Sequence, residues 1–157
     1  MNRQRRNAGF TLAETLLTVA LLGIVLSVVG AAFMAMRETY TKVTLKAEAL
    51  TLYSTAEMEL SDQMHNASDI TVDNDTVSFV SDGMTYTYTN DSDKGILIQD
   101  DGDPIVSDKT NSSGLYTSYN SYRYDNGIFT MNLQVKHGND IIYQHEIKVK
   151  PYAEVNS

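Results

Sequence analysis

The sequence contains no cysteine and only two prolines, the first of them at Pro104. The absence of cysteine excludes a disulfide framework, a thiolate metal site, a cysteine nucleophile and an acylated lipoprotein cysteine. Because the first part of the chain has no proline, nothing there breaks a long helix. Common catalytic motifs are missing as well, including Gly-x-Ser-x-Gly, a phosphate-binding glycine loop and His-Glu-x-x-His. The histidines are scattered, so the sequence does not predict an enzyme.

Basic residues are scarce. The 157 residues include 12 basic and 20 acidic side chains, which gives a net charge of −8. Three of the basic residues, Arg3, Arg5 and Arg6, precede residue 10, so the chain from Phe10 onward has 9 basic against 20 acidic residues, a net charge of −11. A nucleic-acid-binding surface needs cations facing the phosphates. The composition therefore argues against nucleic acid bound by a basic patch.

A long apolar run follows the three arginines. From Phe10 to Met36 the only charged residue is Glu14. A run of this length is sufficient to span a bilayer, and basic residues beside it hold the N-terminus in the cytoplasm. We therefore expect a single-pass inner-membrane protein with a cytoplasmic N-terminus and an exported acidic remainder.

The start of this run has an unusual pattern. Basic residues lead to Gly9, Phe10 follows directly, and the lone carboxylate of Glu14 lies inside the apolar segment. An unpaired carboxylate in such a span costs about 2–3 kcal/mol. The string from Arg5 to Leu17 resembles the class III signal of type IV prepilins and pseudopilins.

The resemblance implies a sequence of events. Prepilin peptidase cuts after Gly9 and methylates the new amine of Phe10, so that residues 1–9 form a cytoplasmic leader. Glu14, then the fifth residue, meets the Phe10 amine of a neighbouring subunit during assembly. Implied partners are other pilin or pseudopilin subunits, an assembly platform membrane protein and membrane lipid. The helix lacks the proline that many pilins carry, and Gly23 and Gly30 are its only weak points.

Two other interpretations of the N-terminus stay open. Ordinary signal peptidase could cleave near Ala32, after the small residues of this region, although the apolar run is long for a secretory signal. In the other interpretation the segment is a generic signal anchor in which Glu14 is incidental.

Beyond Met36 the pattern becomes amphipathic. Apolar residues recur at three- and four-residue steps and predict one buried stripe on a helix that continues the membrane segment. The predicted helix therefore has a transmembrane and assembly part, residues 10–36, and an amphipathic part, residues 37–68. The stripe consists of Leu45, Ala49, Leu52, Tyr53, Ala56, Leu60, Met64 and Ala67.

From residue 69 to residue 157 the pattern predicts an antiparallel β head domain. Short runs with a period of two are separated by turn residues, and Asn126-Gly127 is a strong hairpin signal. The expected strands form one sheet of five to seven, and the stretch from Asp100 to Tyr119 is expected to be irregular. The fold class is thus α+β, a long N-terminal helix packed on an antiparallel sheet, which is also the fold of type IV pilins. The strands are expected at 70–72, 76–80, 84–89, 95–99, 121–124, 128–135 and 141–149.

Residues 50–98 show a second, weaker resemblance, to the J-type pseudopilins and W-type minor pilins. It rests on the order of a helix, a short strand and a hairpin, with apolar residues at matching intervals such as Val77, Phe79 and Tyr86. It implies a minor rather than a major subunit.

Two clusters in the head could bind something. Carboxylates in the irregular stretch are candidates for a loose calcium site, although solvated turn carboxylates are the favoured interpretation, and no other cofactor is predicted. Four tyrosines suit a binding surface, although packing on a half-buried strand is favoured for them. The carboxylates are Asp100, Asp101, Asp103 and Asp108. The tyrosines are Tyr116, Tyr119, Tyr122 and Tyr124.

The sequence thus predicts a non-enzymatic structural subunit of a type IV pilus, a competence pseudopilus or a type II secretion-like filament. Motility, adhesion, DNA uptake and protein secretion are not distinguished by these residues. The alternative is a single-pass membrane-anchored protein whose β domain binds or senses a ligand outside the cell, which would retain residues 1–9.

Overall fold

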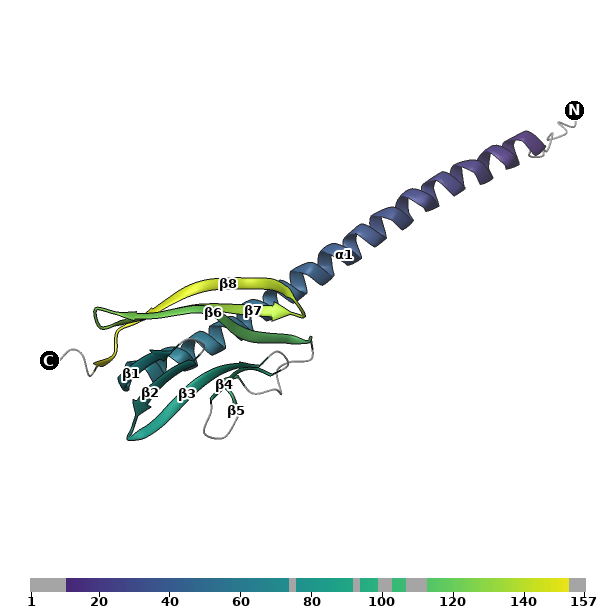
Figure 1. Ribbon diagram of the computed structural model, residues 1–157. Coiled ribbons are helices and arrows are strands. Elements are labelled where there is room, and N and C mark those ends of the chain that lie inside the picture. Colours follow the sequence, from purple (N-terminus) through teal and green to yellow (C-terminus); the bar gives the residue numbers. More distant parts are fainter. Residues whose placement is uncertain (1–10, 74–75, 92–93, 99–102, 107–112, 153–157) are drawn as a thin grey trace, which may run out of the picture. The chain divides into compact units, whose positions relative to one another are not determined.

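The computed structural model of the protein describes residues 11–73, 76–91, 94–98, 103–106 and 113–152. One long helix, α1 (Leu12–His65), precedes all the strands (Figure 1). The chain divides into two compact units, Met1–Lys42 and Val43–Ser157. The first contains the apolar part of α1, and the second contains the rest of α1 and every strand.

The second part of α1 ends at His65, and β1 begins at Ala67. The helix therefore ends before the expected boundary at residue 68. Ala67 and Ser68 already pair with Ser81 and Val80 of the next strand, and Asp69 has a positive φ of 50° beside a register shift. Because Ala67 and Ser68 are engaged in the sheet, the chain turns from the helix directly into β1.

Every expected strand is present, and all the strand pairs are antiparallel, which confirms the α+β prediction. The strands form two sheets, however, and not the single sheet expected: β1-β2-β3-β4-β5 and β6-β7-β8. Their bounds are β1 (Ala67–Asp73), β2 (Thr76–Ser81), β3 (Met84–Asp91), β4 (Gly95–Ile98), β5 (Asp103–Pro104), β6 (Leu115–Asp125), β7 (Ile128–His137) and β8 (Asp140–Val149).

The start of β6 corrects a prediction. Residues 115–119, expected to be irregular because Ser, Asn and Gly surround them, pair with β7. A register shift between Tyr119 and Ser121 changes which face of the sheet the following side chains point to. Tyr119 and Tyr122 therefore contact each other edge to face, with their ring centroids 5.3 Å apart. The hairpin from β6 to β7 was predicted correctly, since Asn126 and Gly127 both have positive φ.

The core of the second unit joins α1 to both sheets. The predicted stripe of α1 is confirmed: six of its members are buried, and Leu45 and Leu52 are partly buried. Tyr53 packs edge to face on Tyr143 of β8 at 4.9 Å, and the hydroxyl of Tyr88 in β3 donates to Gln63 of α1 at 2.6 Å. The helix therefore holds the head domain together rather than standing beside it.

The two sheets are also tied to each other. The Asn90 side chain of β3 donates to the carbonyl of Tyr119 in β6 at 2.8 Å and accepts from its amide at 3.1 Å. Gly95, at a φ of 92°, lies so close to Thr117 that an added Cβ would be 2.7 Å from the hydroxyl oxygen. Only glycine can adopt this positive φ and also come this close to Thr117.

Candidate functional site

The predicted processing site lies at the N-terminal end of the chain. The leader arginines Arg3, Arg5 and Arg6, together with Gly9 and Phe10, fall outside the described residues. Glu14 lies in the first turn of α1. Of the predicted site, the structure thus describes the carboxylate and the helix that carries it.

Glu14 and Thr11 form a reciprocal pair at the helix start. The amide of Thr11 donates to Oε2 of Glu14 at 2.9 Å, and the Thr11 hydroxyl donates to the same oxygen at 3.0 Å. In return, the Glu14 amide donates to the Thr11 hydroxyl at 3.3 Å. This is a capping box, which satisfies backbone donors that a helix N-terminus otherwise leaves free. This capping box was not predicted from the sequence, although Thr-x-x-Glu before an apolar run is its signature.

The apolar side chains in the first part of α1 are not covered by other described residues of the same unit. Its large apolar side chains from Leu12 to Met36 are 54–82% exposed. Hydroxyl side chains in this part bond to the helix backbone: the Thr18 hydroxyl donates to the carbonyl of Glu14 at 2.7 Å, and the Ser27 hydroxyl donates to the carbonyl of Ile24 at 2.7 Å. By length and composition α1 is able to cross a membrane. An apolar helix with its backbone and hydroxyls satisfied internally suits lipid.

The candidate calcium residues are mostly outside the described part of the chain. Asp100, Asp101 and Asp108 are among the residues not described, and Asp103 is exposed at the start of β5. Among the described residues no group of three or more acidic or histidine side chains could hold one metal ion. Calcium binding by this segment therefore stays a prediction.

The tyrosine cluster is engaged within the head domain. Tyr119 is buried, and its hydroxyl donates to the carbonyl of Tyr88 at 3.1 Å. The hydroxyl of Tyr122 donates to the carbonyl of Asp73 at 2.5 Å, and that of Tyr116 donates to Gly138 at 2.6 Å. These contacts support packing as the role of the tyrosines, and Tyr119 is a core residue rather than a surface one.

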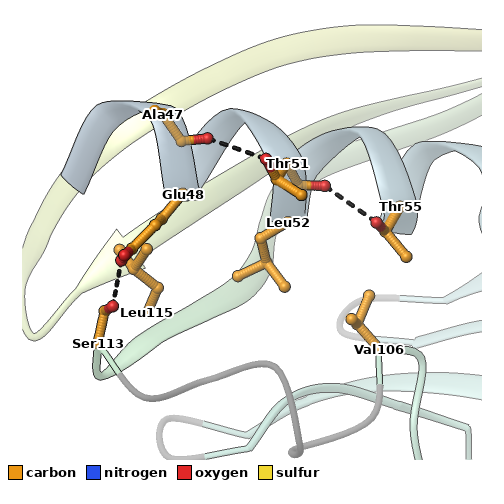
Figure 2. Close-up of a pocket in the computed structure, with 8 residues that line it drawn as sticks. All are labelled: Ala47, Glu48, Thr51, Leu52, Thr55, Val106, Ser113 and Leu115. Atoms are coloured by element: carbon orange, nitrogen blue, oxygen red, sulfur yellow. Dashed lines mark hydrogen bonds between the residues drawn. The ribbon is translucent and has the colours of Figure 1, made fainter. Parts of the chain in front are cut away.

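The structure adds a groove that the sequence did not reveal. A cavity of about 250 Å³ lies between α1 and the segments around β5 and β6 (Figure 2). The hydroxyls of Thr51 and Thr55 bond to carbonyls four residues earlier, at 3.1 and 3.0 Å. Glu48 accepts a hydrogen bond from Ser113 at one end of the groove. Most of its lining is apolar, with Leu52, Val106 and Leu115 as the large side chains.

Comparison with known proteins finds one match. Residues 4–30 match the prokaryotic N-terminal methylation motif. No curated protein and no solved structure is similar enough to count as a match. The matched segment contains Gly9, Phe10 and Glu14, and it shows the prepilin-type signal that the sequence predicted. It indicates a structural subunit and not an enzyme.

Proposed function

We propose that this type IV pilin-like precursor, which prepilin peptidase processes, is a minor pilin or pseudopilin of a type IV-like filament. The observation that carries the proposal is the methylation motif at residues 4–30, which leads directly into an uncovered apolar helix. Lipid covers that helix before assembly. The helices of other subunits replace the lipid once the subunit enters a filament.

The assignment to a minor subunit rests on the head domain. α1 is followed directly by β1 and then by the hairpin of β2 and β3. This is the order on which the weaker resemblance to J-type pseudopilins and W-type minor pilins depends. Quantification of the protein relative to the major subunit in sheared filaments tests it, because a minor subunit is present in a small fraction of the copies.

The Glu14 geometry suits the assembly role proposed for it. Oε2 accepts both bonds from Thr11, and Oε1 has no hydrogen bond to any described residue. Cleavage after Gly9 creates a positive amine on Phe10, one residue before Thr11. An amine of this kind on a neighbouring subunit can therefore pair with Oε1 while the capping box remains intact. An attractive pair in a low-dielectric bundle fixes the axial register, whereas uniform apolar contacts allow sliding.

Cleavage tests the proposal most directly. Intact-mass measurement of the protein from its native membrane should show loss of residues 1–9 and gain of one methyl group. The variant Gly9→Val should stay full length, because a side chain at the scissile position blocks the peptidase, while the neighbouring Ala8→Val serves as the matched control. Normal processing of Gly9→Val would refute the assignment, and a native protein that keeps residues 1–9 would favour the anchored sensor.

A further inference from the structure

The groove between α1 and the segments around β5 and β6 is apolar along its helical side. Three small residues, Ala47, Thr51 and Thr55, follow one another there at four-residue steps. Such a spacing keeps them on one face of the helix and leaves room above them. Both threonine hydroxyls already donate to helix carbonyls, at 3.1 and 3.0 Å, so this side of the groove offers little further hydrogen bonding.

Large apolar side chains border the middle of the groove, and a carboxylate lies at one end. Figure 2 shows Leu52 extending from α1 toward the side that Val106 and Leu115 form. At the end, Oε2 of Glu48 accepts a hydrogen bond from Ser113, while Oε1 has no hydrogen bond to any described residue. Glu48 has no ion-pair partner in the described part of the chain either. The groove therefore combines an apolar middle with one available negative charge.

The surroundings of the groove are mainly acidic. On α1, Glu59 follows one turn beyond Thr55, whereas Lys46 lies roughly 180° from Thr55 around the helix axis, on the opposite face. On the strand side, Asp103 is exposed at the start of β5. His137 lies beside the glycine that precedes Leu115, with its ring 3.7 Å from the position of an added Cβ. A basic group is therefore a better match for this region than an acidic one.

The dimensions of the groove suit an extended peptide. Its volume of about 250 Å³ is below the range of about 300–1,000 Å³ that is usual for small-molecule sites. From Ala47 to Thr55 the helix rises about 12 Å, the length of roughly three to four residues of extended chain. Leu52 lies about 6 Å beyond Glu48 along the helix axis, close to the ~6.6 Å between alternate residues of a strand, whose side chains point to the same side.

We propose that this groove binds an extended segment of a partner protein in which an apolar side chain and a lysine or arginine are two residues apart. The apolar side chain fills the space beside Leu52 and Val106, and the cation pairs with Glu48. This inference goes beyond the proposed function, because it does not require that the chain enters a filament.

The absence of cysteine allows the groove to be probed at one position. Thr51→Cys places a thiol in the groove, and Ser54→Cys places one at an exposed position of the same helix outside it. Each full-length variant is inserted into nanodiscs of zwitterionic lipid, which do not attract basic peptides by charge. The rate of thiol alkylation by iodoacetamide is then measured at rising concentrations of the probe, acetyl-Ser-Leu-Ser-Lys-Ser-amide.

The probe should slow the alkylation of Thr51→Cys and leave that of Ser54→Cys unchanged. Its half-protection concentration should be about three- to fivefold lower than that of the same peptide with serine in place of lysine, because an exposed ion pair contributes that much. Glutamate in place of lysine should weaken protection further. A peptide with leucine and lysine adjacent should also protect less, because neighbouring side chains of an extended chain point to opposite sides.

Several results would overturn the proposal. Absence of protection would show that no such segment binds. Equal protection by the lysine, serine and glutamate peptides would show an apolar cavity without charge selection. Equal protection by the peptide with adjacent leucine and lysine would remove the spacing of two residues. Equal slowing at both thiols would show that the peptide acts on the reagent or on the whole helix.

Variants at Glu48, made in the Thr51→Cys chain, test the role of the carboxylate. Glu48→Gln should remove the preference for lysine over serine, and Glu48→Lys should reverse it in favour of the glutamate peptide. Lys46→Gln, on the opposite face of α1, is the matched control and should leave the preference unchanged. A lysine preference that persists in Glu48→Gln would refute the pairing on which the proposal depends.

Discussion

Leu60 and Met58 offer a test of whether α1 belongs to the core of the head domain. They lie two residues apart on the same helix, yet Leu60 is 0% exposed and Met58 is 68% exposed. Truncating a fully buried leucine to alanine costs about 2–5 kcal/mol, because apolar contacts are lost and a cavity remains. Truncating an exposed side chain changes stability by about 0.5 kcal/mol or less.

The measurement uses a fragment that begins at Arg37. Residues from Val43 onward form one compact unit, so this fragment should be soluble and folded without the membrane segment. With a typical urea dependence of about 1–3 kcal/mol per molar, Leu60→Ala should lower the urea midpoint by roughly 1–3 M. Met58→Ala should leave the midpoint nearly unchanged.

Equal midpoints for the two variants would contradict the packing described here. If the fragment with Leu60→Ala does not fold at all, the conservative Leu60→Met should fold with a small loss of stability. A shorter fragment that begins at Ile70 provides a second check. It lacks three large buried side chains, Tyr53, Leu60 and Met64, worth about 1.5–3 kcal/mol each, against a typical domain stability of about 5–15 kcal/mol. A cooperatively folded sheet starting at Ile70 would show that the helix is dispensable.

Burial raises the pKa of the Tyr88 hydroxyl above its ordinary value of about 10. The contribution of this hydroxyl to the free energy of unfolding is therefore complete below about pH 10 and decreases as the pH rises further. The free energy of unfolding of the fragment should therefore be constant up to about pH 9 and fall above about pH 10, and Tyr88→Phe should weaken this dependence. Glu14→Ala should be inserted and processed normally but should enter filaments poorly, with Glu14→Asp intermediate because its reach is shorter; normal incorporation of Glu14→Ala, measured by immunoblotting of sheared filaments, would contradict the assembly role. Calcium should not change the melting temperature of the fragment relative to chelator, and an increase would instead identify a site in residues 100–108.

Much of the fold follows from periodicity alone. The core stripe of α1, the expected strands and the hairpin at Asn126 and Gly127 were predicted because burial and turn geometry leave local marks in the sequence. The division into two sheets was not predicted. It depends on contacts between distant segments, such as the Asn90 side chain with the backbone of Tyr119, which no local pattern shows.

Errors of the sequence analysis occur where polar residues are structural. Residues 115–119 looked irregular because serine and asparagine surround them, yet Thr117 is buried, and its hydroxyl accepts from the amide of Ile96 at 3.2 Å. For the tyrosines the favoured prediction was packing and the alternative was a binding surface. Packing is what Tyr119 shows, because it is buried and its hydroxyl donates to the carbonyl of Tyr88. Composition describes average exposure, and these residues depart from the average because specific acceptors and donors lie beside them.

The capping box explains how one carboxylate suits two environments. In sequence terms, Glu14 is the costly residue of an apolar span, and the pairing with an amine that we propose would relieve that cost only after a neighbouring subunit has arrived. Before that moment the bonds from Thr11 to Oε2 already satisfy part of the carboxylate, while its charge lies at the positive end of the helix. The same bonds direct the carboxylate toward the N-terminal end of the chain, where the proposed cleavage after Gly9 would place the new amine. We therefore propose that Thr11 is a positioning residue, which holds Glu14 ready in the single subunit for the contact that we propose it makes in the filament.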